Sequence, residues 1–142
     1  MSSRIIEIIK ENSKKIEKAT NRLDCLATLF NAPESKFTTK NGGFCYEDNI
    51  EASTVFQTED TTVTLAIWKK AQAVYPVHCH KDSVEYLMVI KGSFLLKFGG
   101  AVRIMSKGEC ASIPAGVDHT VTSLEGDSQM LAVCIPPEIA YQ

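Results

Sequence analysis

Hydrophobic residues recur along this chain with two different periods, and the change of period divides it into two parts. Over residues 1–30 they fall close to helical spacing, with lysines and acids between them. The pattern predicts one amphipathic helix or two, because NRLD at 21–24 resembles a capping box and NAPE at 31–34 is a stop signal. We expect this helical arm, residues 1–32, to pack on the rest of the chain or on a partner subunit.

From about residue 50 onward the period becomes two, with β-branched residues and turn residues in short blocks. TTVTLAIW at 61–68 and SFLLKF at 93–98 each place apolar side chains on one face of a strand. The glycine pair at 99–100 predicts a tight hairpin, and MLAVCI at 130–135 predicts a last strand. Short strands in succession without helices between them predict an antiparallel sandwich or barrel over residues 50–137.

Composition and charge narrow the functional classes. The 142 residues fit one domain, and 44% hydrophobic with 23% charged residues is typical of a globular protein. No apolar run approaches the roughly 20 residues of a membrane helix, and the charged first residues are not interpreted as a secretory signal. We therefore expect a cytoplasmic protein with no membrane partner. A net charge of −2 argues against a nucleic-acid partner. Five cysteines without a CxxC pair predict free thiols.

The chain has only three histidines, and two of them lie in the segment VHCHKDSVEY. On a strand, His78 and His80 point to one side and Cys79 to the other, so the two imidazoles can chelate one metal ion. A turn over KDSV would bring Glu85 back beside them as an anionic ligand. The competing interpretation is that both histidines are surface residues of an alternating strand. His119 follows a Pro-Ala-Gly bend and begins another alternating strand.

Together these segments resemble the two conserved motifs of the cupin superfamily, in order and at similar spacing. The motifs are His78-x-His80-x4-Glu85-x6-Gly92 and Gly108-x5-Pro114-x-Gly116-x2-His119. The fifteen residues between them are similar to the short inter-motif loop of compact bacterial cupins. Gln72 and Ser123 depart from a glycine and an asparagine of the family pattern, at positions that supply no metal ligand in the family. The resemblance covers about 50–137.

The resemblance implies an all-β fold, a cupin double-stranded β-helix of the jelly-roll type, preceded here by the N-terminal helical arm. It implies four metal ligands, which are His78, His80, Glu85 and His119. The cofactor implied is one divalent transition metal, and Fe, Mn, Ni, Co, Cu and Zn all accept such nitrogen and oxygen ligands. By similarity to small bacterial cupins, a homodimer is expected.

Two function hypotheses follow from the resemblance. The first is a metalloenzyme acting on a small molecule, of dioxygenase, isomerase, lyase or decarboxylase type, with the dioxygenase type slightly favoured. The second is a non-catalytic module that binds a small ligand or metal as a sensor or store.

Side chains outside the four-ligand set are expected to have structural roles. No histidine is left to activate a nucleophilic serine, and no catalytic acid or base is assigned. We expect Tyr46 and Tyr75 to be packed aromatic residues, and Met105, Met130 and Cys134 to fill the core. Lys97 and Arg103 are expected on a solvated outer face.

Overall fold

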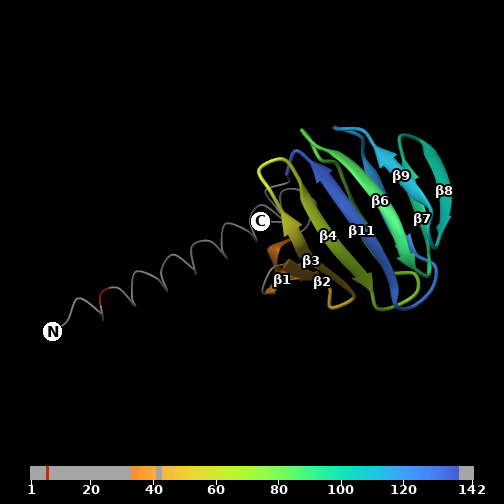
Figure 1. The fold of residues 1–142 in the computed structure, drawn as a ribbon. Coiled ribbons are helices and arrows are strands. Elements are labelled where there is room, and N and C mark those ends of the chain that lie inside the picture. The colour runs from red at the N-terminus through yellow and green to blue at the C-terminus, as the bar shows by residue number, and fades with distance from the viewer. Residues whose placement is uncertain (1–5, 7–32, 41–42, 138–142) are drawn as a thin grey trace.

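The computed structural model describes residue 6, residues 33–40 and residues 43–137, and the described part folds into two antiparallel β-sheets (Figure 1). A short 3-10 helix, η1 (Glu34–Lys36), precedes the first strand. The strands are β1 (Phe37–Lys40), β2 (Gly43–Tyr46), β3 (Ile50–Gln57), β4 (Thr62–Trp68), β5 (Val74–His78), β6 (Val84–Lys91), β7 (Ser93–Phe98), β8 (Ala101–Ser106), β9 (Cys110–Ile113), β10 (His119–Ser123) and β11 (Ser128–Ile135).

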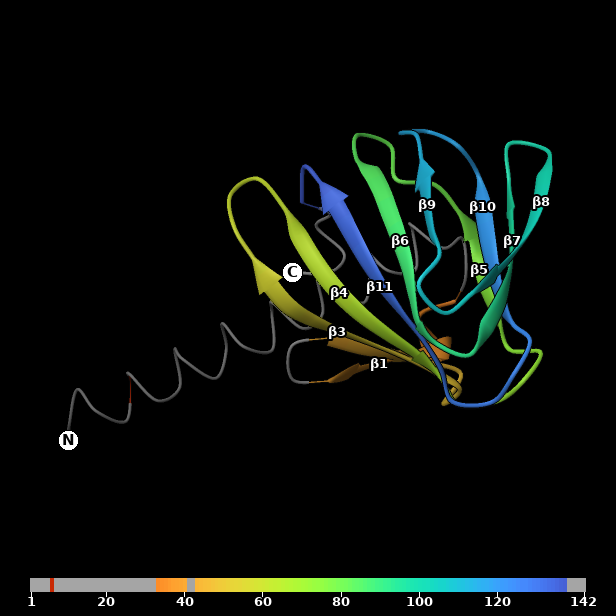
Figure 2. The same ribbon diagram turned by 45° about the vertical axis from the view of Figure 1, so that its right-hand side comes forward.

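The two sheets lie face to face (Figure 2). The larger has seven strands in the order β1-β2-β3-β4-β11-β6-β9, and the smaller has four in the order β5-β10-β7-β8. Strand β11 lies inside the larger sheet and pairs along its length with both β4 and β6. The last strand therefore joins segments that are far apart in the sequence. The antiparallel all-β fold predicted from the strand pattern is confirmed, and so is the jelly-roll barrel that the cupin resemblance implies.

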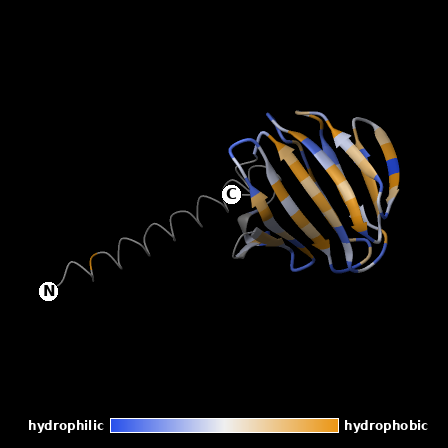
Figure 3. Cartoon of the chain, viewed as in Figure 1, coloured by the Kyte–Doolittle hydropathy of each residue, from blue (hydrophilic) through white to orange (hydrophobic). Residues whose placement is uncertain are grey.

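Alternation of side chains along the strands separates an inner face from an outer one, and Figure 3 shows it as bands of colour. In β7 the inward Phe94 and Leu96 are fully buried, as the sequence pattern indicates. In β4 the buried set is Thr62, Thr64, Ala66 and Trp68, whereas the more hydrophobic residues between them are only partly buried. Apart from Trp68, the inner face of β4 thus has smaller and more polar side chains than the outer face.

The core between the sheets is built mainly from aromatic and long aliphatic side chains. Trp68 and Phe94 meet edge to face with ring centroids 4.7 Å apart, and the centroid of Tyr75 lies 5.7 Å from that of Trp68. Met105 is fully buried beside them, which confirms the core-filling role predicted for it. These rings form an aromatic layer in the core.

Three glycines with positive φ fix two connections between strands. Gly99 and Gly100 have φ of +52° and +79° and connect β7 to β8 in a hairpin, as predicted. Gly92 has φ of +77° where the chain leaves β6 of the larger sheet for β7 of the smaller one. A Cβ atom on Gly92 would lie 2.2 Å from the Ser128 hydroxyl oxygen, so the close approach of β11 excludes any side chain there.

Strands β1 and β2 extend the larger sheet ahead of residue 50, where period-two alternation is first recognisable in the sequence. The predicted helical arm, residues 1–32, lies outside the described residues apart from residue 6, so its division from a barrel domain at 50–137 stays a prediction. Within the described residues, the structure contains no helix that is long and apolar enough to span a membrane.

Replacing Gly92 by alanine should destabilise the fold more than replacing Gly100. Both positions have positive φ, so each substitution costs about 1–2 kcal/mol of backbone strain. Only Gly92 also adds overlap with Ser128, worth about 1–3 kcal/mol more, because no atom lies within 4 Å of a Cβ at Gly100. Urea unfolding of both variants measures the difference. Equal losses in free energy of unfolding would contradict this steric account.

Candidate metal centre

The three histidines and Glu85 come together between the two sheets, although they start from different elements. His78 is the last residue of β5, His119 is the first residue of β10, and these two are direct cross-strand partners. Glu85 comes from β6 of the facing sheet. The KDSV segment therefore crosses between the sheets. Glu85 does lie beside His80 and His119, but the hairpin that was expected to bring it there is wrong. His80 lies beyond the end of β5, so only His78 of the pair is on a strand.

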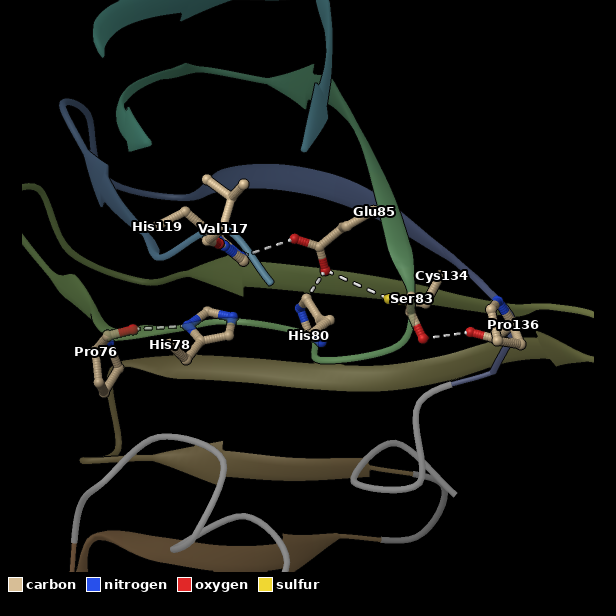
Figure 4. A network of polar contacts seen from close by, with 9 residues as sticks. All are labelled: Pro76, His78, His80, Ser83, Glu85, Val117, His119, Cys134 and Pro136. Carbon is tan, nitrogen blue, oxygen red and sulfur yellow. Dashed lines mark hydrogen bonds and ion pairs between the residues drawn. The ribbon is translucent and has the colours of Figure 1, made fainter. Parts of the chain in front are cut away.

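Figure 4 shows the carboxylate of Glu85 placed between two imidazole rings. Its Oε2 lies 2.9 Å from Nε2 of His80, and its Oε1 lies 3.1 Å from Nε2 of His119. His78 completes the group, with its ring centroid 4.2 Å from that of His119. One ligand atom from each of the four residues lies within 4.8 Å of every other, and all four side chains are buried.

Backbone carbonyls set the tautomers of two of these rings. Nδ1 of His78 lies 2.7 Å from the carbonyl oxygen of Pro76, and Nδ1 of His119 lies 3.0 Å from that of Val117 (Figure 4). Because a carbonyl oxygen only accepts, each Nδ1 carries the proton and donates it. In the neutral ring Nε2 then presents a lone pair, as in histidines that bind metal through Nε2 and are oriented through Nδ1.

Further contacts hold the segments that carry the ligands. The backbone N–H of Gly116 donates to the carbonyl of His80 at 2.9 Å, which ties the second motif to the first. The Ser83 hydroxyl donates to the carbonyl of Pro136 at 2.7 Å, so the crossing segment is fastened beside the end of β11. These bonds connect stretches that are distant in the sequence and therefore could not be predicted from it.

Cys134 was expected only to fill the core, but it also contacts one of the four proposed ligands. It is buried as expected for core filling, but its Sγ also lies 3.5 Å from Oε2 of Glu85. The two residues are cross-strand partners on β11 and β6. Only this register could have revealed the contact, because 49 positions separate them in the sequence.

Burial and neighbouring groups shift the protonation of the cluster. Burial, together with the adjacent His119, lowers the pKa of His78 from its ordinary 6.5 to about 3. Burial alone would raise the pKa of Glu85, but the imidazoles of His119 and His80 beside it hold it below its ordinary range. At neutral pH the cluster therefore offers a neutral His78 and an ionised Glu85, which are the forms that bind metal.

This donor set fits a divalent transition metal. An Nε2 lone pair 3 Å from a carboxylate oxygen is repulsive unless a proton or a cation lies between them. Bonds of about 2.0–2.2 Å to one ion place adjacent ligand atoms about 3 Å apart, in agreement with the Glu85 distances to His80 and His119. Mixed nitrogen and oxygen donors suit several first-row ions and do not select one of them. The buried cluster is thus compatible with metal binding, and the identity of the ion is open.

A cavity of about 30 Å³ adjoins the cluster on the inner side of the barrel. That is space for roughly one or two water-sized groups, well below the roughly 300–1,000 Å³ of a pocket for a drug-sized ligand. Its walls are mostly apolar. The lining residues are Ala52, Thr64, Ala66, Trp68, Tyr75, His78, Glu85, Leu87, His119, Val121, Met130 and Ala132.

The remaining candidates have the structural roles predicted for them. Tyr46 and Tyr75 are buried aromatics with stacked rings 6.4 Å apart, and Tyr75 also lines the cavity. Met130 is a core residue that lines the same cavity. Lys97 is exposed on the outer side of β7, and Arg103 is half exposed with a guanidinium nitrogen 3.6 Å from Glu109.

The chain is similar to known proteins both in sequence and in structure. The sequence model of the cupin domain matches residues 65–136. Quercetin 2,3-dioxygenase from Bacillus subtilis (strain 168) is 27% identical over 67 residues, which are 47% of this chain and 20% of that protein. The chain therefore spans about a fifth of the length of this curated relative.

Two solved structures share the fold at low sequence identity. KdgF from Halomonas sp. has a TM-score of 0.62 at 22% identity, covering 72% of this chain and 88% of that one. An RmlC-like cupin from Shewanella frigidimarina has a TM-score of 0.58 at 17% identity, covering 70% and 82%. These similarities agree with the two-sheet barrel.

The metal-free protein should lose stability on mild acidification because of His78. Between its ordinary pKa of 6.5 and its lowered pKa of about 3, the unfolded chain binds a proton there that the folded protein does not. The free energy of unfolding should therefore fall as the pH is lowered through this window, by about 2 kcal/mol between about pH 6.5 and pH 5. Urea unfolding after chelation measures it. His78→Gln should show a smaller loss over the same window, and an equal loss in both proteins would contradict the assignment.

Proposed function

Because this chain belongs to the cupin domain family, we propose that it binds one divalent transition-metal ion through His78, His80, Glu85 and His119 and acts with it on a small organic molecule. The observation that carries the proposal is the burial of three imidazoles and one carboxylate around a single point, with an adjoining cavity. When bound, the ion supplies Lewis acidity toward substrate oxygen atoms, and iron would also supply oxygen chemistry.

The chain's own residues prepare this site in three ways. The carbonyls of Pro76 and Val117 hold His78 and His119 as Nδ1–H tautomers that direct Nε2 inward. Glu85 contributes one negative charge, so a divalent ion with this ligand set retains a charge of about +1 for an anionic substrate group. The apolar walls of the cavity lower the local dielectric, which strengthens the attraction between that charge and the bound group.

Among enzyme types we favour a dioxygenase over an isomerase, a lyase or a decarboxylase. The sequence similarity to a quercetin 2,3-dioxygenase supports this choice, over the 67 residues that match. The mostly apolar cavity supports it as well, because dioxygen is small and apolar, while charged lining groups other than the cluster itself are absent among the described residues.

The cavity size favours a second candidate, a non-catalytic module that holds a metal or small ligand as a sensor or store. A space of about 30 Å³ leaves room for a water-sized ligand but not for a whole organic substrate inside the barrel. An enzyme would have to bind most of its substrate outside this cavity or enlarge the cavity. A storage or sensor module that holds only a metal or a water-sized ligand requires neither change.

Metal content tests the ligand assignment directly. The double variant His80→Ala with His119→Ala should lose nearly all bound metal, because two of four ligands are gone and Glu85 loses both imidazole contacts. Elemental analysis of protein purified without added metal measures this. Cys79→Ala is the matched control, since Cys79 lies between the motif histidines but outside the cluster, and it should keep its metal. Full retention in the double variant would refute the site.

Oxygen uptake with the same metal-loaded protein separates the two candidate functions. A dioxygenase should consume oxygen with a member of a set of small carboxylates and diketones, and the double variant should not. A metal-loaded protein that binds such molecules without turnover of any kind would favour the sensor or storage module.

We also propose a homodimer formed through the outer face of the larger sheet. Tyr86, Met88 and Ile90 alternate along this face of β6 and are 47%, 39% and 38% exposed. A hollow of about 380 Å³ lies beside Tyr86 and Met88 and is also lined by residues of β8, β9 and β11. Light scattering after size-exclusion chromatography should give twice the 15.6 kDa of the chain. Met88→Lys should reduce the mass to that of a monomer by burying a charge in the interface, and a wild-type monomer would contradict the proposal.

A further inference from the structure

Two residues that line the inner cavity, Thr64 and Trp68, carry a buried polar atom without a hydrogen-bond partner among the described residues. Thr64 is 3% exposed and Trp68 is 2% exposed, and both line the cavity. Among the described residues, neither the Thr64 hydroxyl nor the Trp68 Nε1–H has a hydrogen-bond partner. Leaving a buried donor unsatisfied costs free energy, and native proteins do so mainly where a water or ligand completes the bond.

The pairing of β11 with β4 and β6 shows how these two residues follow one another along β4 from the level of the metal-ligand cluster. Cys134 pairs with Glu85 on one side and with Thr62 on the other, so Thr62 is level with the carboxylate. Thr64 follows two residues later on the same inward face of β4, and Trp68 lies four residues beyond it. Thr64 and Trp68 line the same small cavity as His78, Glu85 and His119 of the cluster.

From this placement we propose that Thr64 and Trp68 form a polar subsite that holds a small hydrogen-bond acceptor on the inner side of the metal centre. This inference rests on the proposed metal binding. Trp68 Nε1 only donates, and the Thr64 hydroxyl donates or accepts, so the ligand must present at least one acceptor atom to the indole or to the hydroxyl. The cavity size limits the bound group to roughly one to three non-hydrogen atoms.

The charges around the cavity further define the ligand. The described lining residues include no lysine or arginine, so nothing there would neutralise a second negative charge beyond the metal. A divalent ion with Glu85 carries a charge of about +1, which a monoanion balances and a dianion exceeds. The subsite thus fits a water, a diatomic acceptor, or a short monoanion, and it excludes a dicarboxylate from the inner side.

Azide binding to the zinc-loaded protein tests the subsite without any assay of turnover. Azide is a short linear monoanion, and its infrared stretching band reports both binding and hydrogen bonding. Thr64→Val keeps the side-chain shape but removes the hydroxyl, and Trp68→Phe removes the N–H. Each should weaken azide binding by about tenfold, because a hydrogen bond to an ion is lost, and each should shift the azide band.

Thr62→Val is the matched control. Thr62 is also buried on the inner face of β4, and its hydroxyl also lacks a partner among the described residues, but it does not line the cavity. It should leave both azide affinity and band position unchanged. Thr64→Ser, which keeps a hydroxyl, should retain most of the affinity and covers the case in which Thr64→Val does not fold.

The outcomes separate the subsite from the metal centre. Wild-type affinity and an unshifted band in Thr64→Val and Trp68→Phe would overturn the subsite while leaving metal binding intact. Equal weakening in Thr62→Val would overturn it too, because the effect would then be a general loss of packing in β4. Failure of the wild-type protein to bind zinc, measured by calorimetry before azide is added, would overturn the metal proposal itself.

Discussion

The buried carboxylate of Glu85 is the group around which the structure is organised. An ionised carboxylate between two sheets is stable only if positive charge or hydrogen-bond donors surround it. Here His80, from a loop, and His119, from the facing sheet, lie within about 3 Å of its two oxygens, so a proton or cation shared with them meets that requirement. The cluster is therefore also a cross-link between the layers.

Much of the site was predictable from the sequence, since three scarce histidines and an acid stand in two motifs whose spacing is specific. The position of His119 at the start of a strand was equally clear, because a Pro-Ala-Gly bend precedes an alternating run. The path of the chain between His80 and Glu85 was not predictable. A polar four-residue stretch is compatible with a hairpin and with a crossing between sheets, and only the partners of β6, which are β11 and β9, decide between them.

The alternation of apolar and polar residues predicted which residues share one face of a strand. It did not predict equally well which of the two faces is buried. In β7 the apolar set turns inward, as hydrophobic burial requires. In β4 the set Val63, Leu65 and Ile67 is on the outer face, and two threonines turn toward the cavity. The sequence pattern of β4 is the same in either orientation, and its register with β11 fixes which one occurs. Where a strand turns its smaller and more polar side inward, the interior gains space and unsatisfied donors.

The position of β11 also has a consequence for how the protein is made. Strand β6, which carries Glu85, has β9 on one side and β11 on the other, and Ser83 is fastened to the chain just after β11. All the proposed ligands leave the ribosome before Ser128, yet their framework is incomplete until β11 inserts between β4 and β6. Acquisition of the ion should thus follow synthesis of the last strand, which makes metal loading a late, post-translational event.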